Sequence, residues 1–194
     1  RPTPPPSGGL YLKHPGDAWR FSMTDNPETT GAATAPVRVR LKNRDAVRAQ
    51  IVLLANQARH ELRLFTPQLD PALYNTAELT DQLASFVARD RHNFVHILVE
   101  DSDQAVRDND RVVLLCRRMS DFVRIHRVGE QHIGLKEMFL VVDRLGYLHQ
   151  PDLTRPDCLS ASADARNAVE LTYRFQEMWE RSEPIRTINT VGLS

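Results

Sequence analysis

The sequence feature that most restricts the fold is a nearly continuous apolar run, Phe94–Val99, which reads Phe-Val-His-Ile-Leu-Val. Such a run favours a strand that is covered on both faces, as strands in a parallel sheet are. It is followed by the polar segment Glu100–Asp103. Asp and Ser before a helix satisfy its free N–H groups, so we favour a helix cap here over a site for a divalent cation. The run and its end together predict a strand followed by a helix.

The segments around this strand alternate between helical and extended patterns. We expect helices over residues 43–58, 80–88, 110–119 and 168–181, and strands over residues 62–66, 94–99, 122–128, 138–142 and 146–149. This alternation predicts an α/β fold with a mixed, mostly parallel sheet that is flanked by helices on both faces. The last two strands are expected to form an antiparallel hairpin around Asp143. The sequence has no Walker loop, no G-x-G-x-x-G and no G-x-S-x-G.

The chain divides into a leader, a domain and a tail. Residues 1–36 are rich in Pro, Thr and Gly and have too little apolar content to offset the entropy of ordering, so we expect a disordered or extended leader or linker. Met23 is a candidate translation start, which would make residues 1–22 an upstream extension. The globular pattern then covers residues 37–184, and residues 185–194 are expected to form a C-terminal tail.

Composition narrows the classes of function. Lys and Arg together number 25, as do Asp and Glu, so the formal net charge is zero, which argues against a surface that coats nucleic acid or membrane throughout. The two cysteines, Cys116 in an apolar run and Cys158 in a polar loop, lack metal-ligand spacing and suggest reduced thiols. No apolar run is long enough to cross a bilayer, and no signal-peptide pattern is present. We therefore expect a cytoplasmic protein that does not associate with a membrane.

Two features of the second half of the chain carry a family resemblance. The closing helix reads Glu170-Leu-Thr-Tyr-Arg-Phe-Gln-Glu-Met-Trp179, with Phe-x-x-x-Trp at its end, and Asp143 begins the turn after an apolar strand. In this order of elements, residues 45–183 resemble one half of a phospholipase D-type protein. The resemblance implies a phospholipase D-like half domain of the α/β class. Because such halves pair about a two-fold axis, it also implies a homodimer.

The H-x-K-x4-D motif of that family can be placed from its aspartate. Counting back from Asp143 puts Met138 where the family has lysine and Lys136 where it has histidine. The family histidine is a nucleophile that forms a covalent phosphohistidine, and the family lysine neutralises phosphate oxygens. A lysine ammonium has no free lone pair, and methionine carries no charge. The resemblance therefore implies a degenerate motif and a chain that is not an enzyme of the family type.

Further candidate residues follow from the resemblance and from spacing. A cleft is implied around the downstream polar residues Ser160, Ser162, Asn167 and Glu170. An anion-binding patch is expected where Arg107, Arg111 and Arg118 share one helical face. The interleaved aspartates leave open a solvated face of ion pairs. Lys136 and Asp143 likewise have two interpretations: relics that still bind an anion, or a solvated strand start and a turn former.

The positions of the histidines in the sequence do not predict a metal site. His126, His132 and His149 show no tight spacing of ligands, and His96 lies within an apolar strand where a core histidine is expected. We therefore predict no metal and no cofactor.

Two functional hypotheses remain. In the first, the chain is a catalytically inactive phospholipase D-like domain that acts as a dimerisation or anion- or nucleic-acid-binding module. The resemblance to degenerate bacterial domains of this kind implies an accessory role beside an acetyltransferase-type partner. In the second, the chain is a phosphodiesterase or nuclease with a divergent active site, in which Lys136 or a nearby histidine acts as nucleophile or base.

Overall fold

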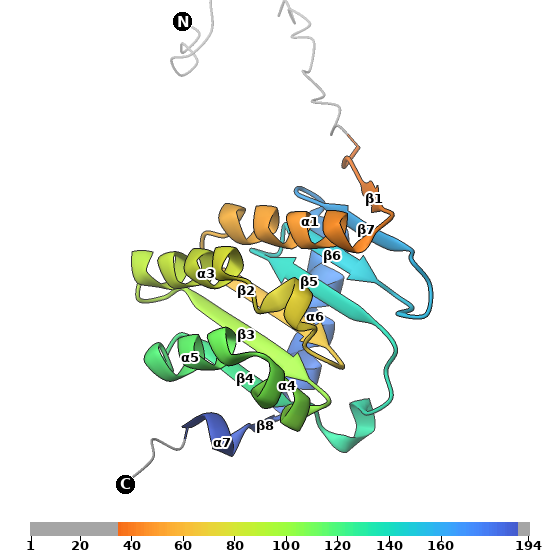
Figure 1. The fold of residues 1–194 in the computed structure, drawn as a ribbon. Helices are drawn as coiled ribbons and strands as arrows, with labels where there is room; N and C mark the ends of the chain where they lie inside the picture. Colours follow the sequence, from red (N-terminus) through yellow and green to blue (C-terminus); the bar gives the residue numbers. More distant parts are fainter. Residues whose placement is uncertain (1–34, 190–194) are drawn as a thin grey trace, which may run out of the picture. The chain divides into compact units, whose positions relative to one another are not determined.

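One mixed sheet organises the computed structural model, which describes residues 35–189 (Figure 1). The strand order is β1-β7-β6-β5-β2-β3-β4-β8. The central strands β2 (Glu61–Thr66), β3 (Phe94–Val99) and β4 (Val123–Arg127) are parallel. All other neighbouring pairs are antiparallel. The predicted mixed α/β sheet is confirmed, but parallel pairing is confined to these three strands instead of extending over most of the sheet as expected.

The remaining strands extend the sheet on both sides of this parallel centre. They are β5 (Met138–Val142), β6 (Gly146–Gln150), β7 (Cys158–Ala161) and β1 (Val39–Leu41) on one side, and β8 (Glu183–Pro184) on the other. The helices are α1 (Arg44–Gln57), α2 (Pro71–Tyr74), α3 (Ala77–Arg89), α4 (Ser102–Asp108), α5 (Asp110–Arg118), α6 (Ala165–Glu180) and α7 (Arg186–Asn189), with a 3-10 turn at Glu130–His132. Within residues 35–189, no helix combines the length and apolar character that a membrane span requires.

Each face of the sheet has its own core. In Figure 1, α1, α3 and α5 lie in front of the sheet, where residues such as Leu54 and Phe86 pack against the strands. Helix α6 lies behind the sheet, and its buried Phe175 and Met178 meet Phe65 and other residues of the central strands. Burial of apolar side chains from both faces explains why the central strands read as continuous apolar runs.

Side chains at the helix starts fix where the helices begin. Asn43 caps α1, because its side chain accepts a hydrogen bond from the N–H of Ala46 at 2.8 Å. Asp101 caps α4 in the same way through the N–H of Gln104 at 2.9 Å. The polar segment after β3 is thus a helix start, as expected.

Some segments differ from the sequence-based expectation. Cys158 was expected in a polar loop, but it is buried in β7, which pairs with both β6 and β1. The four-residue strand is too short to show a pattern of its own, and its conformation depends on its neighbours in the sheet. At the C-terminal side, Ile185 and Ile188 are buried, although the tail was expected to start at residue 185. The expectation for the leader falls outside the described residues, apart from its last two positions, as does that for residues 190–194.

Helix α6 is attached to the sheet by a stack of rings. The indole of Trp179 lies 4.1 Å from the ring of His96 and 3.9 Å from that of His126, nearly parallel to both. Burial and nearby positive charge lower the pKa of His96 to about 3, and the same causes lower that of His126 to about 4. Both imidazoles are therefore neutral at pH 7, and protonation would disturb the packing of α6.

These pKa values predict that the free energy of unfolding decreases at acidic pH. Both histidines have folded-state pKa values below the unfolded value of about 6.5, so the unfolded chain binds more protons and stability falls as pH decreases from 7 through 6.5 toward 4. We expect a loss of about 2 kcal/mol between pH 7.5 and 5, because partial exposure of the rings screens part of the effect. Denaturant unfolding at a series of pH values measures it.

Two variants test whether His96 and His126 cause this pH dependence: one replaces both histidines, and the other replaces an exposed histidine as a control. The double variant His96→Gln/His126→Gln should flatten the dependence of unfolding free energy on pH. His60→Gln, at an exposed position, should leave the slope as in the wild type. An unchanged slope in the double variant would contradict the assignment.

Candidate functional site: a cavity at the carboxyl edge of the central strands

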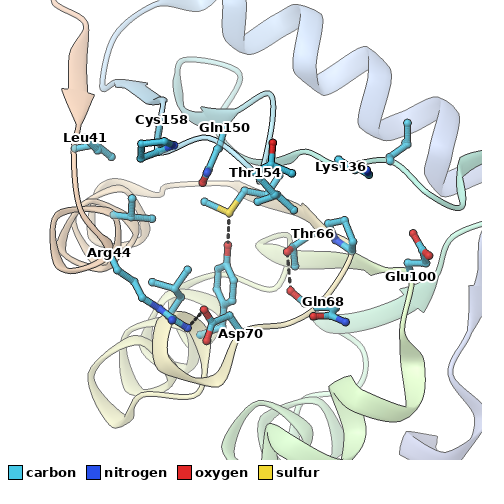
Figure 2. A pocket seen from close by; sticks show the side chains of 18 of the residues that line it. Leu41, Arg44, Thr66, Gln68, Asp70, Glu100, Lys136, Gln150, Thr154 and Cys158 are labelled. Atoms are coloured by element: carbon cyan, nitrogen blue, oxygen red, sulfur yellow. Dashed lines mark hydrogen bonds and ion pairs between the residues drawn. The ribbon is translucent and has the colours of Figure 1, made fainter.

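A cavity of about 680 Å³ lies where β2 and β3 end and β5 begins (Figure 2). It is lined by Leu41, Lys42, Asn43, Arg44, Val47, Thr66, Pro67, Gln68, Asp70, Leu73, Tyr74, Glu100, Asp101, Gly134, Leu135, Lys136, Met138, Gln150, Leu153, Thr154, Pro156 and Cys158. The carboxyl ends of parallel strands are the usual place for ligands in α/β proteins. The volume suits a small molecule or one group of a larger ligand.

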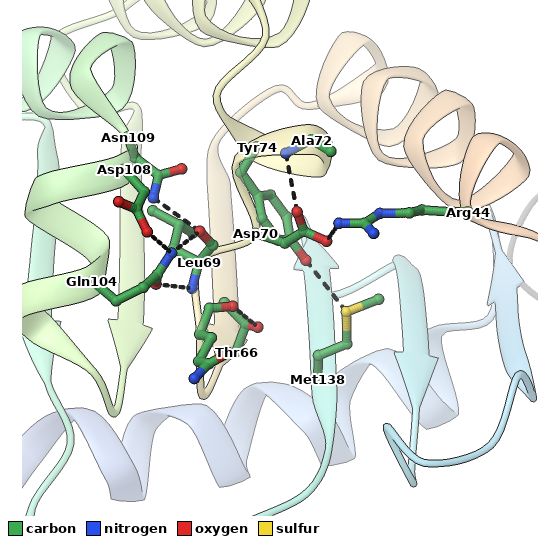
Figure 3. A network of polar contacts seen from close by, with 11 residues as sticks. Arg44, Thr66, Leu69, Asp70, Ala72, Tyr74, Gln104, Asp108, Asn109 and Met138 are labelled. Carbon is green, nitrogen blue, oxygen red and sulfur yellow. Dashed lines mark hydrogen bonds and ion pairs between the residues drawn. The ribbon is translucent and has the colours of Figure 1, made fainter.

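Buried groups of low polarity form part of the wall of the cavity. The hydroxyl of Tyr74 donates to the sulfur of Met138 at 3.4 Å (Figure 3), and burial raises the pKa of this phenol. Burial also raises the pKa of the Cys158 thiol to about 12. Neither group is therefore ionised at neutral pH, and neither supplies an activated nucleophile.

Charged groups of both signs surround the opening. Arg44 forms an ion pair with Asp70 on one side, and Lys136 lies across the cavity from it (Figure 2). The carboxylate of Glu100 accepts a hydrogen bond from the N–H of Gly134 at 2.8 Å. Within residues 35–189, no hydrogen bond or ion pair engages the ammonium of Lys42 or Lys136. These two lysines are available to a ligand, although the charge of Lys136 also acts on the nearby carboxylate of Asp152.

A hydrogen-bond network holds the loop that follows β2 (Figure 3). The side chain of Gln104 both donates to the carbonyl of Leu69 and accepts from its N–H, each at 3.0 Å. Asn109 donates to the same carbonyl at 2.8 Å. The hydroxyl of Thr66 donates to the carbonyl of Gln68 at 2.7 Å. This wall of the cavity is consequently fixed by α4 and the start of α5.

The three residues that were expected to form the family motif lie at the two ends of β5. Lys136 and Met138 line the cavity, whereas Asp143 lies in the turn at the other end. The carboxylate of Asp143 accepts hydrogen bonds from the N–H groups of Arg59, His60 and Glu61 at 2.8, 2.8 and 2.9 Å. Its φ of 52° also makes it a turn former. The structure does not bring Asp143 to Lys136, and its contacts are those of a structural residue.

The residues of the expected cleft do not line this cavity either. The hydroxyl of Ser160 is buried, donates to the carbonyl of Tyr147 at 2.6 Å and accepts from Gln50. Asn167 donates to the carboxylate of Asp164 at the start of α6. Ser162 and Glu170 are exposed. None of these four residues therefore lines the cavity to which Lys136 belongs.

The expected arginine patch is only partly available. Arg107 forms an ion pair with Asp108 at 3.0 Å, which matches the alternative of a salt-bridged face at that position. Arg111 and Arg118 are exposed on α5, and in the described part of the chain neither forms an ion pair, although the charge of Arg111 acts on the neighbouring carboxylate of Asp110. Among residues 35–189, no group of histidine, cysteine and acidic side chains is arranged to hold a metal ion.

Sequence reasoning missed the role of Glu137. Although it follows Lys136, it is buried on the opposite face of the sheet, where Arg174 of α6 donates to it at 3.0 Å and His149 lies 3.2 Å away. Side chains of neighbouring strand residues point to opposite faces, so this alternation could have separated Glu137 from Lys136. Its negative charge is thus already engaged away from the cavity.

Several solved structures resemble this chain, among them members of the phospholipase D family. Nuc from Salmonella typhimurium, a phospholipase D family member, has a TM-score of 0.56 and 11% identity, over 77% of this chain and 97% of its own. TrmBL2, an archaeal chromatin protein with a novel mode of DNA binding, has a TM-score of 0.57 and 16% identity, over 82% of this chain and 57% of its own. Phosphatidylserine synthase from Haemophilus influenzae Rd KW20 has a TM-score of 0.55 and 12% identity, over 81% of this chain and 40% of its own. At these identities the likeness shows the fold, which is phospholipase D-like.

The family of the chain is shown by its sequence. Residues 43–191 match the model of the family described as Domain of unknown function (DUF7931), and the chain belongs to this family. A comparison with curated proteins finds no match. The matched region begins at the cap of α1 and includes all the strands except β1.

The contacts of Asp143 generate a stability prediction. Asp143→Ala leaves three N–H groups before and at the start of β2 without their acceptor, so we expect a loss of about 2 kcal/mol in unfolding free energy. Asp143→Asn should cost less, because asparagine keeps one acceptor and tolerates the turn. Chemical denaturation provides the measurement.

Asp157→Ala is the matched control, because it removes a carboxylate from an exposed ion pair with Arg40. We expect it to cost under about 0.5 kcal/mol. Equal losses for Asp143→Ala and Asp157→Ala would show that the three backbone contacts do not stabilise the fold.

Proposed function

We propose that this domain is a catalytically inactive phospholipase D-like module that binds an anionic, phosphate-containing group in the cavity around Lys136. The observation that supports the proposal is the content of the cavity. Its lining, as residues 35–189 describe it, includes no histidine. Lys136 stands where the family nucleophile is expected, and Met138 stands where the family lysine is expected. The site thus keeps a positive charge but has no group suited to form a phosphohistidine.

Three further groups of the cavity do not replace the missing nucleophile, whereas a fourth, the hydroxyl of Thr154, does donate to a carboxylate, that of Asp152, at 2.6 Å. The Tyr74 phenol and the Cys158 thiol have raised pKa values, so both stay protonated. The Thr66 hydroxyl donates to a backbone carbonyl rather than to a general base. Hydrolysis needs a nucleophile that a neighbouring base or charge activates, and none of these three groups has one.

Binding of an anion is supported by the distribution of charge. Lys42 lies between β1 and α1, Lys136 lies just before β5, and both line the same cavity. Arg44 and Asp70 neutralise each other, and Asp101 accepts a hydrogen bond within the cap of α4. A phosphate group that contacts both lysines would gain charge-assisted hydrogen bonds without displacing an existing ion pair.

The proposal extends to partners. The similarity to TrmBL2 and the exposed Arg111 and Arg118 support nucleic acid as the source of the phosphate groups. Pairing of phospholipase D-like halves about a two-fold axis supports a homodimer. The resemblance to degenerate bacterial domains supports an accessory role beside an acetyltransferase-type module.

Replacing Lys136 by Gln removes one of the two available cations while keeping a polar side chain. We expect binding of inorganic phosphate and of a single-stranded oligonucleotide to this cavity to weaken about tenfold, which corresponds to ~1.4 kcal/mol for a lost charge-assisted contact. Isothermal titration calorimetry at low and moderate salt provides the affinities. The control is Arg91→Gln, at an exposed position outside the cavity, which should bind like the wild type.

Catalysis is tested on the same proteins. We expect no hydrolysis of bis-p-nitrophenyl phosphate or of single-stranded DNA above the buffer rate. Hydrolysis that is lost in Lys136→Gln and kept in Arg91→Gln would overturn the inactive assignment in favour of a divergent phosphodiesterase. Equal affinity of all three proteins for phosphate and oligonucleotide would overturn the assignment of the cavity.

Light scattering coupled to gel filtration tests the oligomeric state. We expect a mass near twice the 22.1 kDa of the chain, because a half domain of this fold is completed by a second copy. A concentration-independent mass of one chain would contradict the homodimer while leaving the anion-binding proposal intact.

A further inference from the structure

A second cavity, of about 440 Å³, lies at the other edge of the sheet, between the end of α5, strand β4 and the segment that contains β8 and α7. Its polar lining residues are Arg117, Ser120, Arg124 and His126, and the rest of the lining is apolar apart from Cys116. No carboxylate belongs to this lining, as far as residues 35–189 describe it. The first cavity, by contrast, has three carboxylates at its rim.

The two guanidinium groups retain unused donors. Arg117 donates through Nε to the carbonyl of Ile188 at 3.3 Å and through one terminal nitrogen to that of Thr187 at 3.4 Å. Arg124 donates only through Nε, to the carbonyl of Ser120 at 3.4 Å. In the described part of the chain, neither guanidinium has a carboxylate partner. One terminal nitrogen of Arg117 and both of Arg124 are therefore available to a ligand.

His126 connects this cavity with the ring stack of α6. Its Nδ1 lies 2.9 Å from the hydroxyl of Ser182, and its ring is stacked on Trp179. The positive charge of Arg124 is one of the two causes that lower the pKa of His126, after burial. An anion beside Arg124 would offset that charge, so both the titration of His126 and the emission of Trp179 should report its binding.

We propose that this cavity is a second anion site, separate from the one around Lys136, which binds a phosphate group through Arg117, Arg124 and Ser120. Guanidinium groups match the geometry of phosphate oxygens through paired N–H donors, and a hydroxyl can supply a further donor. The apolar remainder of the lining leaves room for an organic body attached to the phosphate. The inference goes beyond the proposed function, which concerns the first cavity.

The test uses the emission of a single tryptophan. The chain has two tryptophans, Trp19 and Trp179, so the Trp19→Phe background isolates Trp179. Inorganic phosphate should change its emission in a saturable way, and NMR should show an increase in the pKa of His126 at saturation. Arg124→Gln should weaken this binding about tenfold, as expected for one charge-assisted contact.

Comparison of variants assigns the signal to one cavity. Arg124→Lys, which keeps the charge, should recover part of the affinity, and Lys136→Gln should leave the Trp179 signal unchanged. Circular dichroism confirms that each variant is folded. If Arg124→Gln binds as tightly as the wild type, or if the signal is lost in Lys136→Gln instead, the second site does not exist as proposed.

Three further ligands distinguish the sources of the phosphate. Tighter binding of adenosine monophosphate than of inorganic phosphate would support a small phosphate monoester. Tighter binding of a 5′-phosphorylated oligonucleotide than of the unphosphorylated one would support a nucleic-acid end. Absence of a Trp179 response with inorganic phosphate and with all three ligands would overturn the proposal.

Discussion

The requirement to cover both faces of the central strands determines where chemistry can occur in this fold. The middle of β2, β3 and β5 is buried between the helices in front of the sheet and α6 behind it. Polar groups in that region need internal partners, as Arg63 finds in Glu61 and Glu137 finds in Arg174. Groups that can meet a ligand are therefore confined to the strand ends and to the outer edges of the sheet, where both cavities lie.

At the carboxyl edge, the fold keeps the shape of a site while its chemistry differs from that of the family it resembles. The contact between Tyr74 and Met138 forms part of the wall of the cavity, close to Lys136, and three carboxylates balance part of the positive charge. A cavity of this composition can select a ligand by its charge and shape. The proposed binding role follows from that contrast.

Much of the fold could be predicted, because the central strands and the amphipathic helices carry local patterns, as Phe94–Val99 and the cap at Asn43 show. The short strand β7 could not, because its conformation depends on partners far away in the sequence. The positions of Lys136 and Met138 in a cavity were within reach of sequence reasoning. The pairing of Arg44 with Asp70 was not, because no local pattern brings these two residues together. The five steps from Met138 to Asp143 span roughly 17 Å in an extended strand. This separation is not apparent when the motif is read as a string of letters.

The division of β5 into a structural end and a cavity end has a consequence for how such a chain can change over time. Asp143 supports the fold from the end opposite to Lys136, and the cavity is lined largely by loops and by the ends of strands and helices. Substitutions in the cavity therefore have little effect on the contacts that keep the domain folded. In an architecture of this kind, the residues of the cavity can be substituted during evolution while the fold is retained. A shared fold then does not imply a shared reaction.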